Sequence, residues 1–251
     1  MRYATAKAPD TLDYSSTEAL NSICSNLAFT GKNMRKLVFT SSTSGEGKSL
    51  LTFQVACNLA KRGKRVVLID ADLRRSTMAK KMNLETTGEL TGLVHYLTNQ
   101  NSLDDILYST SISNIYIIPA GRCLKNPVHL LDSDDFRELL SRLAASFDMV
   151  LVDAPPVGLV IDAAEIAKAC DGTILVARYN EARRRDLIEV KRQMLQTGCP
   201  ILGCIINMAT FDGLVEKKYY NRGYYSHYND LNKTAKSKHN PSPHLKKPAA
   251  K

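Results

Sequence analysis

A glycine-rich stretch in the first fifth of the chain carries the residue types of a phosphate-binding loop. The sequence TSSTSGEGKS, residues 40–49, follows an apolar run and precedes a segment of helical period. Glycines let backbone N–H groups turn toward phosphate oxygens, the Lys can contact the β and γ phosphates, and the Ser hydroxyl can ligate Mg²⁺. The strict pattern G-x-x-x-x-G-K-[ST] fails only at its first glycine, which here is Ser42. We expect a nucleotide site formed by Ser44, Gly45, Glu46, Gly47, Lys48, Ser49 and Leu50.

Three carboxylates follow two other apolar runs. The stretch VVLIDADLRR places Asp70 and Asp72 just after one run, and MVLVDAPP ends another run with Asp153. Ligand sites of α/β proteins lie at the carboxyl ends of the strands, and a carboxylate after four apolar residues is typical of a Walker-B strand. An acid at a strand end can also be a helix cap or a turn former. Because three acids converge on one phosphate loop, we expect them to include the acidic element that holds a metal ion beside Ser49.

The elements that position these residues are short apolar runs that alternate with segments of helical period. The runs lack apolar/polar alternation, which is typical of strands buried on both faces. They cover residues 36–40, 65–70, 114–120, 148–154, 172–178 and 200–207. The helical segments cover residues 50–62, 88–99, 133–146, 163–169 and 181–196. This order predicts an α/β fold of the P-loop NTPase type, a doubly wound, mostly parallel sheet with helices on both faces.

The two ends of the chain differ from this body. Residues 15–29 predict a helix capped by Ser15 or Ser16, with Leu20, Ile23 and Leu27 in its apolar stripe. The segment after residue 216 is rich in Tyr, Asn, Lys, Ser and Pro and has almost nothing to bury, which predicts disorder. We therefore divide the chain into an N-terminal segment and helix (1–34), a nucleotide-binding domain (35–216) and a flexible tail (217–251).

The tail is basic and carries a cluster of tyrosines. Nine of the chain's 34 Lys and Arg but only one of its 25 Asp and Glu lie in it, so the body is nearly neutral despite a net charge of +9. Such a cluster could pack as an aromatic patch or stack on nucleobases. A phosphate site in the same chain adds a third possibility, that these tyrosines accept phosphate. They are Tyr219, Tyr220, Tyr224, Tyr225 and Tyr228.

Composition also indicates a compartment. The six cysteines show no metal-binding spacing, as expected of reduced thiols in a cytosolic protein. The N-terminus lacks the apolar core of a signal peptide, and no apolar run approaches the ~18 residues of a membrane span. We expect a cytoplasmic protein that reaches the inner face of the cell membrane only peripherally.

Taken together, SSTSGEGKS, VVLIDADLRR, MVLVDAPP and the tyrosine-rich end resemble the bacterial tyrosine kinases (BY-kinases) of capsular and exopolysaccharide synthesis, in the form with a separate cytosolic kinase chain. The stretch NPVHLLDSDDF is similar to the family's N-P-x-x-L-L segment. The distinguishing motif is Asp-x-Asp-x-Arg, here Asp70, Asp72 and Arg74.

The resemblance implies an ATP-dependent protein-tyrosine kinase that phosphorylates its own tail and regulates polysaccharide synthesis and export. By this resemblance Lys48 and Ser49 bind the triphosphate and Mg²⁺, Asp72 and Asp153 hold the waters of the metal ion, and Asp70 receives the tyrosine proton. Lys48, Asp70 and Asp72 are then the catalytic residues. Arg74 belongs to the same motif and is expected at the nucleotide, and Asn207 is expected near the adenine by resemblance to related nucleotide-binding folds.

The resemblance also implies partners. These are a membrane-anchored activator, further copies of the chain in a ring or dimer, and a cognate tyrosine phosphatase. This sequence differs from the family's assembly motif E-x-x-R-x-x-R, because Asn21 and Cys24 stand after Glu18 where the motif has arginines. Neither side chain replaces the bidentate, permanent charge of Arg.

Two other functions are compatible with parts of the sequence. A partition or division-site ATPase would use ATP as a dimerisation switch, but the signature Lys of that class is Thr43 here. A nucleic-acid binder would use the basic, aromatic tail, but the neutral body offers no basic face, so we expect no nucleic-acid partner.

Overall fold

The computed structural model describes residues 1–31 and 33–209. The tyrosine cluster and the predicted boundary at residue 217 lie outside these residues. The predicted disorder of the tail and its predicted role as phosphate acceptor therefore concern residues that the structure does not describe.

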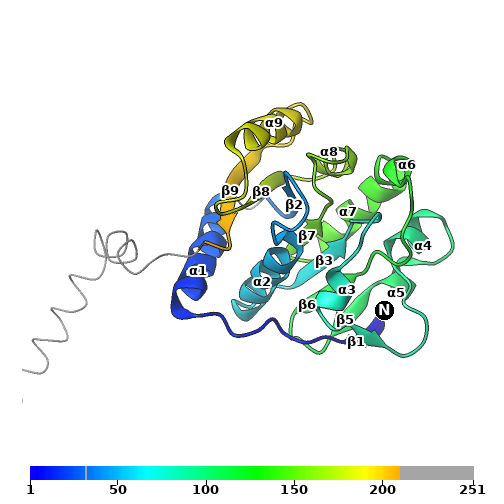
Figure 1. Cartoon of the computed structure of the whole chain (residues 1–251). Helices are drawn as coiled ribbons and strands as arrows, with labels where there is room; N and C mark the ends of the chain where they lie inside the picture. The colour runs from blue at the N-terminus through cyan, green and yellow to red at the C-terminus, as the bar shows by residue number, and fades with distance from the viewer. Residues whose placement is uncertain (32, 210–251) are drawn as a thin grey trace, which may run out of the picture. The chain divides into compact units, whose positions relative to one another are not determined.

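Strands of the described part form one sheet in the order β4-β1-β5-β6-β3-β7-β2-β8-β9 (Figure 1). Six of them match the predicted apolar runs: β2 (Lys36–Ser41), β3 (Val66–Asp70), β6 (Ile115–Ile118), β7 (Met149–Asp153), β8 (Gly172–Arg178) and β9 (Ile201–Asn207). The pairs β3·β6, β3·β7, β2·β7, β2·β8 and β8·β9 are all parallel. The predicted mostly parallel α/β sheet is confirmed.

Three short strands extend the sheet beyond β6. They are β1 (Arg2–Thr5), β4 (Glu85–Thr86) and β5 (Tyr108–Thr110). β5 pairs antiparallel with β6 and parallel with β1, and β4 pairs antiparallel with β1. Sequence patterns did not predict these strands, because runs of two to four mixed residues carry no measurable periodicity.

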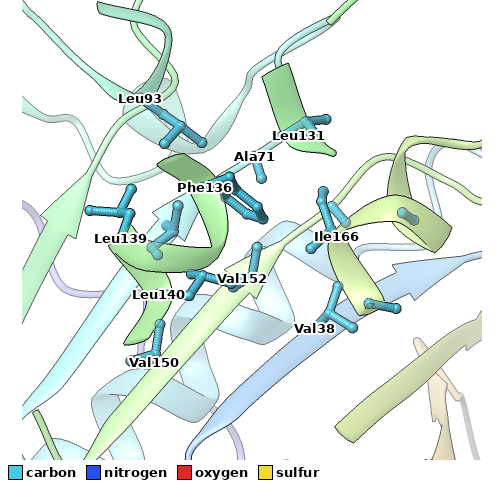
Figure 2. Packing of buried hydrophobic residues seen from close by; sticks show 14 of the residues in the cluster. Val38, Ala71, Leu93, Leu131, Phe136, Leu139, Leu140, Val150, Val152 and Ile166 are labelled. Atoms are coloured by element: carbon cyan, nitrogen blue, oxygen red, sulfur yellow. The ribbon is translucent and has the colours of Figure 1, made fainter. Parts of the chain in front are cut away.

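Helices cover both faces of the sheet. In the described part they are α1 (Tyr14–Phe29), α2 (Lys48–Lys61), α3 (Met78–Lys81), α4 (Leu93–Leu97), α5 (Leu103–Ile106), α6 (Val128–Leu131), α7 (Asp134–Ser146), α8 (Asp162–Ala167) and α9 (Arg184–Leu195). Successive strand residues point to opposite faces. Leu37, Phe39 and Leu68 thus pack in one apolar cluster with α1 and α2. Val38, Val150 and Val152 pack in a second cluster with α7 and α8, where Phe136, Leu139 and Leu140 fill the space over β7 (Figure 2).

Two predicted helices differ in detail. Asp13, rather than Ser15 or Ser16, caps α1, because its carboxylate accepts a 2.7 Å hydrogen bond from the backbone N–H of Ser16. The expected helix over 88–99 is reduced to α4. Gly92 is extended at the start of α4, and the N–H groups of Leu93 and Val94 donate to the carbonyl oxygens of Pro119 and Ala120, so the chain before α4 runs along the end of β6 and is not helical.

The described residues include no helix that is both long and apolar enough to cross a membrane.

Candidate active site

The phosphate-loop sequence forms a tight turn between β2 and α2. Gly45 and Gly47 have φ values of 87° and 80°, in the left-handed region that glycine adopts at least cost. Gly47 is the N-cap of α2 and has no side chain to satisfy the first N–H groups of the helix. The backbone N–H groups of Lys48, Ser49 and Leu50 therefore offer hydrogen bonds at the start of α2, where the helix dipole is positive. This arrangement suits an anion.

Glu46 stabilises this loop from inside. Its side chain is buried, and its carboxylate accepts hydrogen bonds from the Ser42 hydroxyl at 3.0 Å and from the Thr43 backbone N–H at 2.9 Å. The backbone N–H of Arg178, at the end of β8, donates a longer bond of 3.4 Å. The predicted nucleotide contact of Glu46 can thus come only from its backbone, since its carboxylate is used within the loop.

Lys48 lies between the two carboxylates that were predicted to serve the metal. Its Nζ is 3.3 Å from Oδ1 of Asp153 and 3.7 Å from Oδ2 of Asp72. The Ser49 hydroxyl lies 3.4 Å from the same Nζ. All four side chains are buried or nearly so, so these charges interact in a poorly solvated site.

Asp70 is a third carboxylate, held beside the others by the sheet. Asp70 and Asp153 are paired residues of the neighbouring parallel strands β3 and β7. The Ser76 hydroxyl donates a 2.5 Å hydrogen bond to Oδ2 of Asp70, and the Asp72 backbone N–H donates a 3.3 Å bond to Oδ1. Burial, and then the charge of Asp153, raises the pKa of Asp70 to about 7. Burial also raises the pKa of Asp153, although Lys48 opposes this shift.

Arg74 of the same segment is engaged with the protein. Its guanidinium donates to both oxygens of Asp162 at 2.7 and 2.9 Å and to the carbonyl oxygen of Lys125 at 2.6 Å. Asp162 is fully buried at the start of α8. Arg74 therefore links the segment after β3 to α8 and to the segment after β6, and its contact with a nucleotide stays a prediction.

Asn207 ends β9 beside the loop. Its side-chain amide donates a 2.9 Å hydrogen bond to the carbonyl oxygen of Glu46. This position at the edge of the phosphate loop is compatible with the predicted adenine contact, which stays a prediction.

With this geometry in place, comparisons with known proteins identify the family. Residues 34–181 match the family described as AAA domain. Tyrosine-protein kinase CpsD of Streptococcus agalactiae is 39% identical over 190 residues, which is 76% of this chain and 81% of the relative. The chain belongs to the bacterial tyrosine-protein kinases.

Solved structures agree with this membership. The kinase domain of Escherichia coli tyrosine kinase ETK is 27% identical to this kinase, with a TM-score of 0.72 over 79% of each chain. The septum site-determining protein MinD of Pyrococcus horikoshii, solved with Mg-ADP, is 25% identical, with a TM-score of 0.58 over 68% of this chain and 69% of that one. The division-site ATPases thus share the kinase's fold but resemble it less.

Sequence reasoning missed two side chains of the site. Ser76 was not singled out, although it directly follows the stretch VVLIDADLRR, which contains Asp70 and Asp72. Asp162 was not singled out either, because only the folded chain brings α8 to Arg74. An acidic residue at the start of a predicted helix was the only available signal for Asp162, and it indicates a cap more often than a buried partner.

Among residues 1–31 and 33–209, no three His, Cys, Asp or Glu side chains form a group able to hold a metal ion by themselves. This is compatible with Mg²⁺, which keeps several water ligands and is usually bound through one or two carboxylates and the phosphates of a substrate. A hydroxyl from Ser49 and carboxylates from Asp72 and Asp153 supply the oxygen donors that this ion prefers.

Proposed function

We propose that this kinase transfers the γ-phosphoryl group of ATP to the tyrosines of its own C-terminal cluster, acting in trans on a neighbouring copy, and so regulates the synthesis and export of a capsular polysaccharide or exopolysaccharide. The observation that carries the proposal is the placement of Lys48, Asp153 and Asp70 at one edge of the sheet, beside a loop of free helix amides. Phosphoryl transfer needs this combination of charge neutralisation and an oriented base.

The phosphates would bind at the start of α2. The amides of residues 44–50 offer hydrogen bonds to phosphate oxygens, and Lys48 offers a positive charge to the β and γ phosphates. In the structure Lys48 is paired with Asp153 and Asp72. Binding of the triphosphate would transfer this lysine from the carboxylates to the phosphate oxygens.

Release of the lysine would leave Asp72 and Asp153 available to a cation. We propose that they hold the waters of Mg²⁺ while Ser49 ligates the ion. When bound, Mg²⁺ supplies neutralisation of the charge on the β and γ oxygens.

Asp70 is the proposed base for the attacking tyrosine. A free tyrosine has a pKa near 10, so its hydroxyl needs an aligned acceptor at neutral pH. In the transfer, the tyrosine oxygen forms a bond to the γ phosphorus, the bond between that phosphorus and the β–γ bridging oxygen breaks, and Asp70 accepts the tyrosine proton. Ser76 and the Asp72 backbone N–H orient the Asp70 carboxylate for this task.

The length of the chain allows the cluster to reach an active site. From Asn207 at the end of β9 to Tyr219 is twelve residues. An extended chain of this length spans at most about 40 Å, comparable with the width of a domain.

We also propose a membrane-anchored activator, assembly into a ring or dimer and a cognate phosphatase, with a cytoplasmic location at the membrane through the activator. The assembly would not use the family's helix motif. Cys24 is buried, and Asn21 accepts a 2.9 Å hydrogen bond from Asn58 of α2, so both motif positions face α2 rather than a neighbour.

The test is mass spectrometry of the tail after incubation of the full chain with Mg-ATP, with and without a candidate activator fragment. Wild-type protein should gain phosphate on Tyr219, Tyr220, Tyr224, Tyr225 and Tyr228. Lys48→Met and Asp70→Asn proteins should gain none, while a mixture of Lys48→Met protein with a tagged wild-type copy should show phosphate on the inactive chain. ATP-dependent dimerisation without phosphate, in the presence of a verified activator, would instead support the partition-type switch.

A further inference from the structure

A second pocket, of about 500 Å³, lies outside the phosphate loop at the carboxyl end of β6. Its lining comes from the segment before α4, from α4 itself, from the residues just after α4 and from those just after β6. Four polar side chains of its lining, His95, Gln100, Asn101 and Arg122, can donate hydrogen bonds, and a fifth, Thr91, is already bonded to Arg2 and to the carbonyl oxygen of Asp105. Glu89 is the one acid in this lining. The pocket's chemistry therefore favours an anion.

His95 lines this pocket with an imidazole ring that is held in place. The side chain is nine-tenths buried, with 9% of the residue exposed, and its Nδ1 accepts a 3.1 Å hydrogen bond from the backbone N–H of Gly92. This bond leaves the proton of the neutral ring on Nε2. Gly121 backs the ring so closely that a Cβ there would lie 2.7 Å from Nδ1. No described residue accepts a hydrogen bond from Nε2. Its N–H is therefore a donor without a protein partner, on a ring that the bond to Gly92 orients.

Arg122 adds an uncompensated charge. Its side chain is exposed, and within residues 1–31 and 33–209 it has no ion pair or hydrogen bond. A guanidinium binds the oxygens of a phosphate in a bidentate manner, and the neighbouring amides of Gln100 and Asn101 can donate to the same group. The volume lies within the range of pockets that hold small ligands, large enough for a phosphorylated aromatic side chain.

The pocket neighbours the proposed phosphoryl-transfer site. β6 and β3 are adjacent and parallel, with Ile118 paired to Ile69. Beyond the strands, the Leu124 N–H donates 2.8 Å to the Leu73 carbonyl oxygen, and Arg74 binds the carbonyl oxygen of Lys125. With adjacent strands ~4.8 Å apart and a rise of ~3.3 Å per residue, Gly121 lies on the order of 10 Å from Asp70.

We propose that this pocket is a phosphotyrosine-binding subsite, which holds one phosphorylated tyrosine of a substrate peptide and so places another tyrosine at Asp70. The inference rests on the proposed function, in which the clustered tyrosines are the substrates. Tyr220 and Tyr224 are four residues apart, and Tyr225 and Tyr228 are three apart. In an extended peptide these separations correspond to ~10–14 Å, similar to the ~10 Å estimated between Gly121 and Asp70. Later phosphates should therefore be added faster than the first.

Binding tests the pocket without any catalysis. A peptide with the sequence of residues 217–230 and phosphate on Tyr224 is titrated by calorimetry against the full-length kinase without ATP. Arg122→Gln should weaken its binding about tenfold, as expected for loss of a charge-assisted hydrogen bond. Glu89→Gln should strengthen the binding, since it removes the opposing charge. The matched control is Arg142→Gln, an exposed arginine of α7 whose loss should change nothing.

Three results would overturn the proposal. They are equal affinity for the unphosphorylated peptide, affinity for inorganic phosphate alone that equals affinity for the phosphopeptide, and affinity that Arg122→Gln leaves unchanged. The first excludes a phosphate site, the second shows a plain anion site, and the third places the ligand elsewhere.

A kinetic measurement separates this inference from the proposed function. Intact-mass spectrometry over time gives the rates at which one, two and more phosphates are added to each chain. In Arg122→Gln the ratio of the later rates to the first should fall several-fold, whereas Arg142→Gln should keep the wild-type ratio. If wild-type protein gains no phosphate, the proposed function fails. If it gains phosphate and the ratio is the same in Arg122→Gln, only the subsite is refuted.

Discussion

The side-chain amide of Asn207 lies directly against Gly47, so closely that a Cβ on Gly47 would come within 2.3 Å of Nδ2. The same amide binds the carbonyl oxygen of Glu46 at 2.9 Å. The last residue of β9 thereby holds the backbone of the phosphate loop at the point where α2 begins. This contact leads to a test of the loop with two glycines.

Gly47→Ala should weaken ATP binding at least tenfold, because the new methyl group must displace Asn207 and with it the loop. Gly45→Ala is the matched control, since Gly45 has a similar left-handed φ but nothing within 4 Å of an added Cβ. Both changes carry the backbone cost of a left-handed alanine, about 1 kcal/mol. Calorimetric titration with ATP measures the difference. Equal affinities for the two variants would show that the contact with Asn207 has no role.

Asp70→Asn should abolish phosphoryl transfer but stabilise the fold at neutral pH. The folded-state pKa of Asp70 is about 7 and its usual value is 3.8, so the folded chain holds this proton where the unfolded chain has lost it. The stability associated with this proton is present below pH 4 and is lost as the pH rises through 7. The free energy of unfolding of Asp70→Asn should therefore exceed that of the wild type increasingly from pH 5 to pH 8, by on the order of 2 kcal/mol.

Urea unfolding of the nucleotide-free protein at several pH values gives this difference. For Glu138→Gln, which removes an exposed carboxylate of α7, the free energy of unfolding should change with pH in the same way as for the wild type. A parallel profile for Asp70→Asn as well would mean that Asp70 is ionised in the folded protein at all these pH values.

Glu46→Ala should destabilise the kinase by about 1–3 kcal/mol and weaken nucleotide binding, because it leaves the Ser42 hydroxyl and the Thr43 N–H without their buried acceptor. Glu181→Ala removes an exposed partner of Arg178 and should cost less than about 1 kcal/mol. Thermal unfolding of both variants measures the loss of stability, and titration with ATP measures the loss of nucleotide affinity. Loss of binding without loss of stability would indicate that Glu46 contacts the nucleotide directly.

Arg74→Ala should cost about 3–5 kcal/mol, because Asp162 is fully buried and would lose its ionic partner. The double variant Arg74→Ala, Asp162→Ala should recover part of this loss. Arg137→Ala breaks ion pairs on the surface and should cost less than about 1 kcal/mol. Denaturant unfolding of the wild type, Arg74→Ala, Asp162→Ala and the double variant gives the coupling energy. A coupling near zero would show that Arg74 does not stabilise the fold through Asp162.

The sequence predicted the central sheet well, because its strands are continuous apolar runs whose carboxyl ends must meet at one edge. That rule also placed Asp70 and Asp153 together, and they are paired residues in the structure. The environment of Glu46 could be predicted only in part, since one donor to its carboxylate is the Arg178 N–H, 132 residues away. The fate of Arg74 depended in the same way on Asp162. Local patterns locate charges at strand ends, but only the packed chain decides which charges neutralise each other.

The place of β1 in the sheet has a consequence during protein synthesis. Arg2 pairs with Tyr108, and β1 lies next to the edge strand β4, on the far side of the sheet from β9, although it precedes the other described strands in the chain (Figure 1). At 5–20 residues per second, a ribosome needs roughly 5–20 s to make the intervening residues. Of the described strands, only β4 can pair with β1 during this interval, and the two can join the rest of the sheet only after β5 has emerged. One of the earliest strands to be translated is thus one that must wait to fold.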